Sequence, residues 1–187
     1  KKVKHILGLG DHHTCISPSV SSYSSSQDNS VYPAASVLTE SVDSDTSPYN
    51  YWLGQSGAHI IFDLSCLGSI NGVTLKNTRK GSGNDAGTKE FSLWTSDSAT
   101  GSWTQITLTD GVMTTAIDED PVTTQDVSFS TLSTQFVKFQ VDGVYGTVGG
   151  LQYITFNSSI TTAITITSTT TTFIAISLKF VRRTESV

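Results

Sequence analysis

Short runs in which apolar and polar residues alternate recur along most of this chain. Successive side chains of a β-strand point to opposite faces, so alternation with period two predicts strands with one buried face. Apolar spacings of three and four, which would indicate amphipathic helices, are nearly absent. The runs that predict strands are residues 59–64, 72–76, 90–94, 102–106, 126–129 and 136–141. Gly, Asn and Asp turns separate these runs, which is typical of an antiparallel β-sandwich or barrel.

Two regions depart from this rhythm. Residues 17–50 are rich in Ser, Asp, Pro and Tyr with few apolar anchors, which predicts long surface loops. After Asn157 alternation returns, with apolar residues on even positions and Ser, Thr, Ala or Lys on odd ones, around a polar connection at 168–172. This pattern predicts a C-terminal β-hairpin with one apolar face.

Composition narrows the class of protein. A chain of 187 residues is long enough for one well-buried core, so we expect one domain with extensions. Only 14% of the residues are charged, and Ser and Thr crowd almost every segment, which is unusual for a cytosolic protein. The net charge is -5, and basic residues cluster only at the two ends of the chain. The sequence therefore offers no row of Lys and Arg side chains to bind the phosphates of a nucleic-acid backbone. The composition therefore argues against nucleic acid as a partner.

The two cysteines, Cys15 and Cys66, are too few and too far apart for a zinc site or a Cys-x-x-Cys redox pair. They either pair or are two buried thiols. The hydroxyl-rich composition and the glycosylation sequon at Asn157 favour a secretory compartment, where a disulfide would add about 4 kcal/mol in the chain-entropy model. No signal peptide or membrane-length apolar run appears, so we expect a mature secreted chain or a fragment of one.

Candidate catalytic groups are sparse. His5 and the Asp11-His12-His13 segment form the only histidine cluster. Adjacent histidines on an extended segment point to opposite faces, so His12 and His13 cannot bind one metal ion together without a bend. No Gly-x-Ser-x-Gly elbow is present, and the acidic run at 118–120 precedes a proline as a loop would. We therefore expect that this chain is not an enzyme.

An ordered set of short segments resembles one known family. They include Tyr51-Trp52, the Ile60-Ile61-Phe62-Asp63-Leu64 run, Lys89 to Asp97, and the closing Gly149-Gly150-Leu151-Gln152-Tyr153-Ile154-Thr155-Phe156. Over residues 15–157 the chain resembles discoidin domains, the coagulation factor 5/8 type C family. The resemblance implies a galactose-binding-like jelly roll, with Trp52 and the even positions of 60–64 in its core. Residues 1–14 would then be an N-terminal extension and residues 158–187 a Thr-rich C-terminal hairpin extension.

The resemblance implies a binding module that uses loops at one end of the sandwich, here residues 20–33, 40–51, 77–89 and 143–150. Sugar sites need planar donors and acceptors for hydroxyls and an aromatic ring for the apolar sugar face. The loop residues that offer these groups are Asn77, Arg79, Asn84, Asp85, Tyr49 and Tyr145, with Tyr23 as a further aromatic candidate. The alternative is that residues 77–85 form only a solvated hairpin loop.

Related sugar-binding members often carry a structural calcium before the tryptophan, which here places Glu40, Asp43 and Asp45 as candidate ligands. The family's acidic ligand near the last strand falls at Tyr153, a poor substitute, so a solvated acidic loop is the alternative. Loops rich in Tyr and Ser, without apolar spikes or a basic collar, argue against membrane lipid as a partner.

These observations predict an extracellular, non-catalytic module, secreted or on the cell surface, that binds carbohydrate in a lectin-like way or serves cell adhesion. Its partner would be a glycan or a cell-surface or matrix glycoprotein. The alternative is a structural subunit of a filament, coat or matrix that self-assembles through its terminal extensions. The apolar face of a hairpin must be covered, either by the sandwich itself or by a neighbouring subunit.

Overall fold

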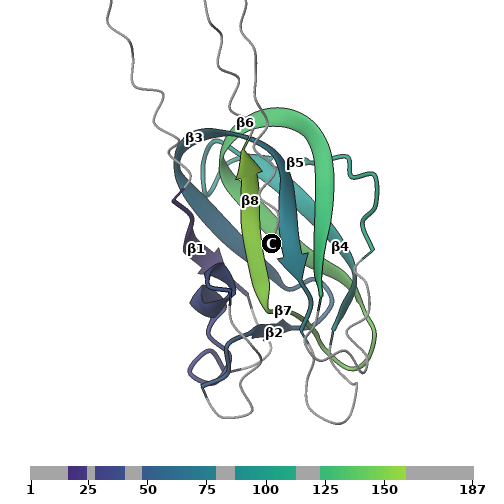
Figure 1. Ribbon diagram of the computed structural model, residues 1–187. Helices are drawn as coiled ribbons and strands as arrows, with labels where there is room; N and C mark the ends of the chain where they lie inside the picture. The colour runs from purple at the N-terminus through teal and green to yellow at the C-terminus, as the bar shows by residue number, and fades with distance from the viewer. Residues whose placement is uncertain (1–16, 25–27, 41–47, 79–86, 113–122, 159–187) are drawn as a thin grey trace, which may run out of the picture.

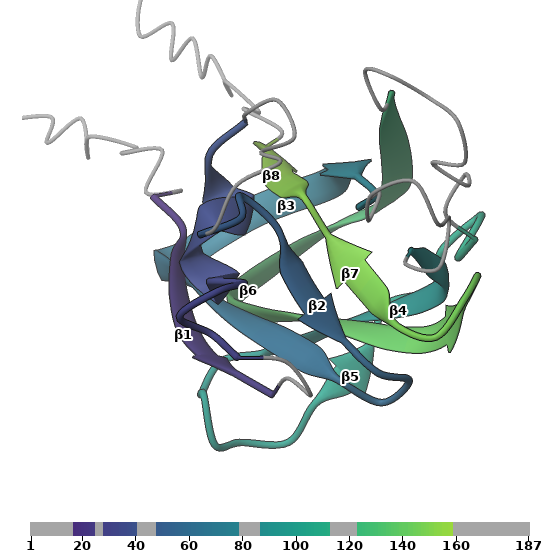
Figure 2. The same cartoon turned by 90° about the horizontal axis from the view of Figure 1, so that it is seen from below.

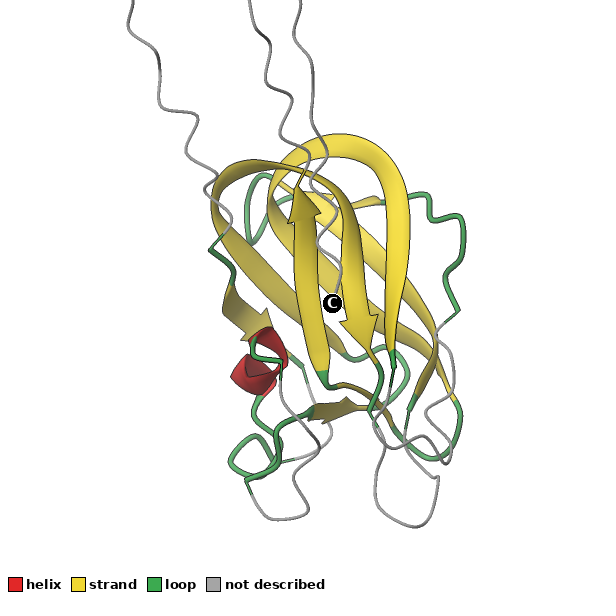
Figure 3. Ribbon diagram, in the orientation of Figure 1, coloured by secondary structure: helices red, strands yellow, loops and turns green. Residues whose placement is uncertain are grey.

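The computed structural model describes residues 17–24, 28–40, 48–78, 87–112 and 123–158 (Figure 1). Antiparallel strands dominate these residues, and the helical part of them is one 3-10 turn (Figure 3). The elements in chain order are β1 (Ser19–Tyr23), η1 (Ala34–Leu38), β2 (Trp52–Gly54), β3 (His59–Lys76), β4 (Thr88–Ser96), β5 (Thr104–Gln105), β6 (Thr124–Val144), β7 (Gly149–Leu151) and β8 (Tyr153–Ser158). The predicted all-β sandwich is confirmed, whereas the predicted C-terminal hairpin and the N-terminal extension lie outside the described residues.

Two long strands, β3 and β6, connect the two layers. One layer has the strand order β1-β3-β6-β4-β5, and β8 pairs with the second half of β3 in the other layer. The β3–β6 register shifts between residues 63 and 68 and again between 70 and 72. Irregular pairing of this kind bends a strand, and both strands arch over one end of the molecule (Figure 1).

This continuity corrects one expectation. Residues 59–64 and 72–76 read as two strands in the sequence, as did 126–129 and 136–141, because polar and glycine residues interrupt the alternation. The structure joins each pair into one bent strand, because β3 and β6 remain hydrogen-bonded to each other on both sides of the register shifts.

The core lies between the layers, as the alternation predicted. The side chains of Ile60, Phe62 and Leu64 are fully buried, and Trp52 reaches them from β2 with none of its surface exposed. The ring centroids of Phe62 and Phe156 are 5.4 Å apart in an edge-to-face pair that joins the two layers. The two-stranded β2–β7 sheet lies across the end of the sandwich opposite to the arches (Figures 1 and 2).

His59 begins β3, as expected of a strand-end residue. Its Nδ1 lies 3.1 Å from the Ser24 hydroxyl, which also accepts a hydrogen bond from the His59 backbone N–H (3.0 Å). Burial lowers the pKa of His59, and the nearby charge of Lys138 lowers this pKa further.

The lowered pKa of His59 predicts a pH dependence of stability. The unfolded chain binds this proton more tightly than the folded chain, so stability falls as the pH drops below about 6.5. Urea denaturation of the wild-type chain and of His59→Gln at pH 7.5 and pH 5 measures the effect. The wild type should lose more stability than His59→Gln between the two pH values; equal losses would contradict the assignment.

Candidate functional site

Loop segments meet in two pairs at the β2–β7 end. The backbone N–H of Tyr49 donates to the carbonyl of Val31 (2.8 Å). The N–H of Gly87 donates to the carbonyl of Val148 (2.9 Å), and the N–H of Tyr145 donates to the carbonyl of Gly87 (2.9 Å). These residues come from all four segments that the sequence placed at one end of the sandwich, so parts of all four meet there; residues 20–23 of the first segment belong instead to strand β1, which pairs with β3.

Three tyrosines whose rings all contact one another, Tyr32, Tyr49 and Tyr51, connect the two pairs of loops; we call them the tyrosine cluster. The ring centroids of Tyr32 and Tyr49 are 5.0 Å apart with planes inclined by 10°, and those of Tyr49 and Tyr51 are 5.3 Å apart. Tyr51 is buried against Leu53 and Val148, while Tyr32 and Tyr49 pack against this group and are only partly buried. The cluster is therefore an aromatic surface with a buried base and partly open outer rings.

A polar turn sets the position of Tyr32. The Asp28 carboxylate accepts hydrogen bonds from the backbone N–H and the hydroxyl of Ser30, both at 2.8 Å, and these bonds hold the pKa of the Asp28 carboxyl below its usual value. The Asp28 carbonyl accepts the N–H of Tyr32 (2.9 Å), and the Asn29 side chain accepts the N–H of Ala34 (3.0 Å). The turn therefore satisfies its own backbone hydrogen-bonding groups and fixes the position of the Tyr32 backbone, from which the ring extends.

Asn77 has a structural role rather than the predicted role in ligand binding. It is 3% exposed; its Oδ1 accepts the N–H groups of Thr78 and Thr88, both at 3.0 Å, and its Nδ2 donates to the Thr88 carbonyl (2.8 Å). The Thr88 hydroxyl in turn donates to the Gly150 carbonyl (2.7 Å). These bonds hold the two ends of loop 79–86 together and against β7, so the amide of Asn77 is not presented to a ligand.

Replacing Asn77 by alanine should lower the free energy of unfolding by about 2 kcal/mol, because buried backbone groups at Thr78 and Thr88 lose their partners. Urea denaturation measures this loss. Asn29→Ala, which removes a single bond in a more open turn, is the matched control and should cost less. Equal costs for the two variants would contradict the structural role of Asn77.

The other predicted ligand residues divide into two groups. Tyr49 belongs to the tyrosine cluster, and Tyr145 is half-buried in the loop that Gly87 holds. Arg79, Asn84 and Asp85 lie outside the described residues. Tyr23, the further aromatic candidate, is 42% exposed on β1.

Sequence reasoning did not predict that Tyr32 and Tyr51 join Tyr49 in the tyrosine cluster. Tyr51 was identifiable, because it directly precedes the core residue Trp52 at the start of β2, and neighbours in extended backbone point to opposite sides. Tyr32 lies in a loop, where no periodicity indicates which way a side chain points. Its stacking on Tyr49 depends on loop geometry that the sequence pattern does not show.

The predicted calcium and disulfide sites are only partly within the described residues. Glu40 is exposed, and Asp43 and Asp45 lie outside the described residues. In the ranges that the structure describes, no three His, Cys, Asp or Glu side chains are grouped to hold a metal ion. Cys66 on β3 is disulfide-bonded, but Cys15 lies outside the described residues, so the pairing of the two stays a prediction, as does calcium.

The glycosylation sequon begins on the last described strand. Asn157 of the sequon is half-buried on β8 opposite Gly72, and its glycosylation stays a prediction. His5, His12, His13 and the acidic run 118–120 lie outside the described residues. None of the described helical structure is long and apolar enough to span a membrane.

The sequence matches no protein-family model and no curated protein. Solved structures, however, share its fold. A family 32 carbohydrate-binding module of Clostridium perfringens in complex with galactose aligns with a TM-score of 0.53 at 12% identity, over 72% of this chain and 91% of that module.

Two further modules align over a larger share of both chains. A second Clostridium perfringens family 32 module, in complex with GalNAc-β-1,3-galactose, aligns with a TM-score of 0.55 at 10% identity, over 78% of this chain and 98% of the module. The family 32 module of Streptococcus pneumoniae EndoD aligns with a TM-score of 0.54 at 15% identity, over 78% and 99%. This chain therefore has the jelly-roll β-sandwich fold of the family 32 carbohydrate-binding modules, the fold that the resemblance to discoidin domains implied, while membership of the discoidin family itself stays a prediction.

Proposed function

We propose that this chain is a non-catalytic carbohydrate-binding module and that its ligand binds at the tyrosine cluster. The observation that carries the proposal is the partly open stack of Tyr32 and Tyr49 at the loop end of the sandwich. Aromatic rings contact the apolar face of a sugar, and neighbouring polar loop groups bind its hydroxyls. Solved modules with this fold bind galactose and a GalNAc-galactose disaccharide, which supports the same class of ligand here.

The loop of residues 79–86 is proposed to supply polar contacts. Both of its ends belong to the β2–β7 end: Gly87 bonds to Val148, and the Thr78 side chain lies against Gly150. Arg79, Asn84 and Asp85 are within this loop and carry the planar donors and acceptors that vicinal hydroxyls require. The hydroxyls of Tyr32 and Tyr49 add further polar groups at the rim of the same surface.

An extracellular location and a structural calcium ion belong to the same proposal. Glycans that end in galactose are exposed outside cells, and the hydroxyl-rich composition fits that setting. Calcium would be held by Glu40, Asp43 and Asp45 through hard oxygen ligands. A calcium titration followed by calorimetry and by the melting temperature tests it; absence of both heat and a melting shift would reject the ion.

A glycan-array screen of the purified chain, with calcium and with EDTA, tests the function. We expect signals on glycans with terminal galactose or GalNAc, and we expect Arg79→Ala to weaken them. A blank array under both conditions would reject the proposal and favour the alternative of a structural subunit.

A further inference from the structure

The outer face of the five-stranded sheet carries a second group of aromatic residues. Ladder partners across the sheet place Ile61 of β3 beside Lys138 of β6, and Lys138 beside Trp94 of β4. The residues on both sides of Ile61 and of Lys138 along their strands belong to the core, as does Leu93 before Trp94, so this row faces outward. Trp103, just before β5, lies on the same side and is half-exposed like Trp94. The row is separate from the tyrosine cluster, which lies over the β2–β7 sheet.

The ammonium group of Lys138 lies between two indole rings. Its Nζ is 4.7 Å from the ring centroid of Trp94 and 5.2 Å from that of Trp103. The Trp94 ring is held by a hydrogen bond from its Nε1 to the Ser92 hydroxyl (2.9 Å). Such cation–π contacts are attractive and fix the position of the charge.

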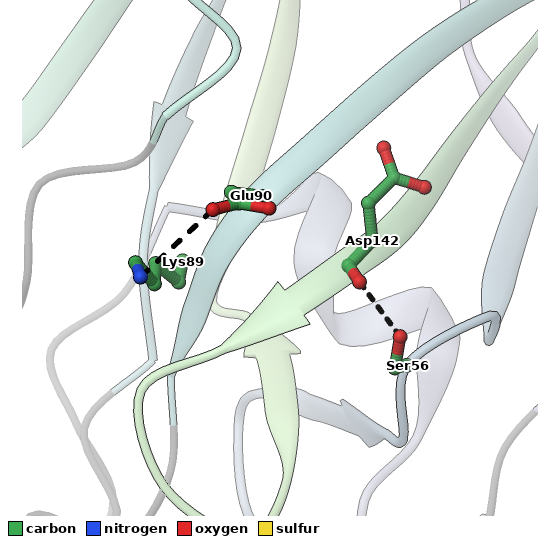
Figure 4. Close-up of polar contacts among 4 residues, drawn as sticks. All are labelled: Ser56, Lys89, Glu90 and Asp142. Carbon is green, nitrogen blue, oxygen red and sulfur yellow. Dashed lines mark hydrogen bonds and ion pairs between the residues drawn. The ribbon is translucent and has the colours of Figure 1, made fainter.

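Among the described residues, this ammonium group has no hydrogen bond and no ion pair. Asp142 is the acidic residue whose charge acts on it, but the Asp142 carboxylate accepts a hydrogen bond from Gln140 (2.9 Å). By contrast, Lys89 forms an exposed ion pair with Glu90 (3.9 Å), which Figure 4 shows. The same figure shows the Ser56 hydroxyl donating a hydrogen bond to the backbone carbonyl of Asp142. Burial lowers the pKa of Lys138. Asp142 raises this pKa from a distance, but a partly desolvated cation with no anion in direct contact is stabilised further when a ligand supplies one.

We propose that Trp94, Lys138 and Trp103 form a second ligand site, which binds a carboxylate-bearing sugar such as a uronic acid unit of an acidic glycan. The sugar carboxylate forms a charge-assisted hydrogen bond with the Lys138 ammonium group. The ring of the same sugar contacts the exposed parts of the two indoles, and Gln105, exposed next to Trp94 in the ladder, lies within the same face for its hydroxyls. This site does not depend on glycan binding at the tyrosine cluster.

Tryptophan fluorescence reports this site selectively. The chain has three tryptophans, and Trp52 is fully buried in the core, so direct contact with a ligand is possible for Trp94 and Trp103 alone among them. The aromatic residues of the described tyrosine cluster contribute nothing when tryptophan is excited selectively. The probe is an oligogalacturonate of three units, and its neutral control is an oligosaccharide of galactose of the same length.

The full chain is titrated with both probes, and calorimetry measures the affinity. We expect a saturable change in emission with oligogalacturonate and none with the neutral probe. Lys138→Met keeps the apolar stem but removes the charge, and it should weaken binding at least about tenfold. Lys138→Arg keeps the cation and should retain most of the affinity, and Lys89→Met, the matched control for loss of a positive charge, should bind as the wild type does.

Three outcomes would overturn the proposal. One is the absence of a saturable emission change, and another is equal weakening by Lys138→Met and Lys89→Met. The third is loss of oligogalacturonate binding in Tyr49→Ala, which would place the acidic sugar at the tyrosine cluster instead. If Lys138→Met fails to fold, Trp103→Phe replaces it, because a half-exposed indole outside the core should be dispensable for folding and should weaken binding.

Discussion

Gly150→Ala should lower the free energy of unfolding by about 3 kcal/mol, as expected for strong overpacking of a buried position. A Cβ atom on Gly150 would lie 2.2 Å from Cγ2 of Thr78 and 2.7 Å from the carbonyl oxygen of Trp52. The second neighbour is backbone of the paired strand β2, which cannot rotate away. β7 must therefore separate from β2, and the loops that it positions move with it. Urea denaturation followed by far-ultraviolet circular dichroism measures the loss.

Gly57→Ala is the matched control. Nothing lies within 4 Å of a Cβ built at Gly57, but its φ of +87° disfavours any side chain. This variant should lose only about 1 kcal/mol through backbone strain. A Gly150→Ala variant that loses no more than Gly57→Ala would show that β2 and β7 are not packed closely at Gly150.

Tyr49→Ala should weaken glycan binding about 100-fold, which corresponds to roughly 3 kcal/mol for loss of a central aromatic contact. Tyr49 contacts both Tyr32 and Tyr51, so its removal eliminates one partly exposed ring and takes a stacking partner from Tyr32. Calorimetry with the glycan that gives the strongest array signal measures the affinity. Tyr49→Phe keeps the ring and should lose less than Tyr49→Ala.

Tyr23→Ala controls for the loss of an exposed tyrosine. Tyr23 is 42% exposed on β1 and takes no part in the tyrosine cluster, so its removal should leave glycan affinity unchanged. Unaltered binding by Tyr49→Ala, or equal losses in Tyr49→Ala and Tyr23→Ala, would contradict the assignment of the tyrosine cluster as the ligand site.

The core was predictable from the sequence because burial in a strand follows a period of two. Ile60, Phe62 and Leu64 alternate with more polar or outward residues, and all three are fully buried with Trp52. Strand continuity was not predictable, because a bend and a turn both appear as interruptions of the same alternation. Only the register shared with β6 shows that β3 continues beyond Asp63.

The candidate sites depend on contacts between residues distant in sequence, and alternation does not predict such contacts. The side-chain amide of Asn77 has the donor and acceptor groups of a ligand-binding residue, yet it bonds to the backbone of Thr88 on the far side of a loop. Likewise, period two places Trp94 and Lys138 on outer faces of their strands, but only the β4–β6 register brings them together. The sequence therefore indicated the end of the sandwich and the residue types, whereas the stacking arrangement came from the structure.

Carbohydrate binding at the tyrosine cluster is tested most directly by a nuclear magnetic resonance titration. The chain is labelled with nitrogen-15 and titrated with the glycan that gives the strongest array signal. The largest shifts are expected for backbone amides of residues 30–32, 49–51 and 145–148, with small changes along the outer face of β4 and β6. A titration in which the shifts avoid these segments while the glycan binds would contradict carbohydrate binding at the tyrosine cluster.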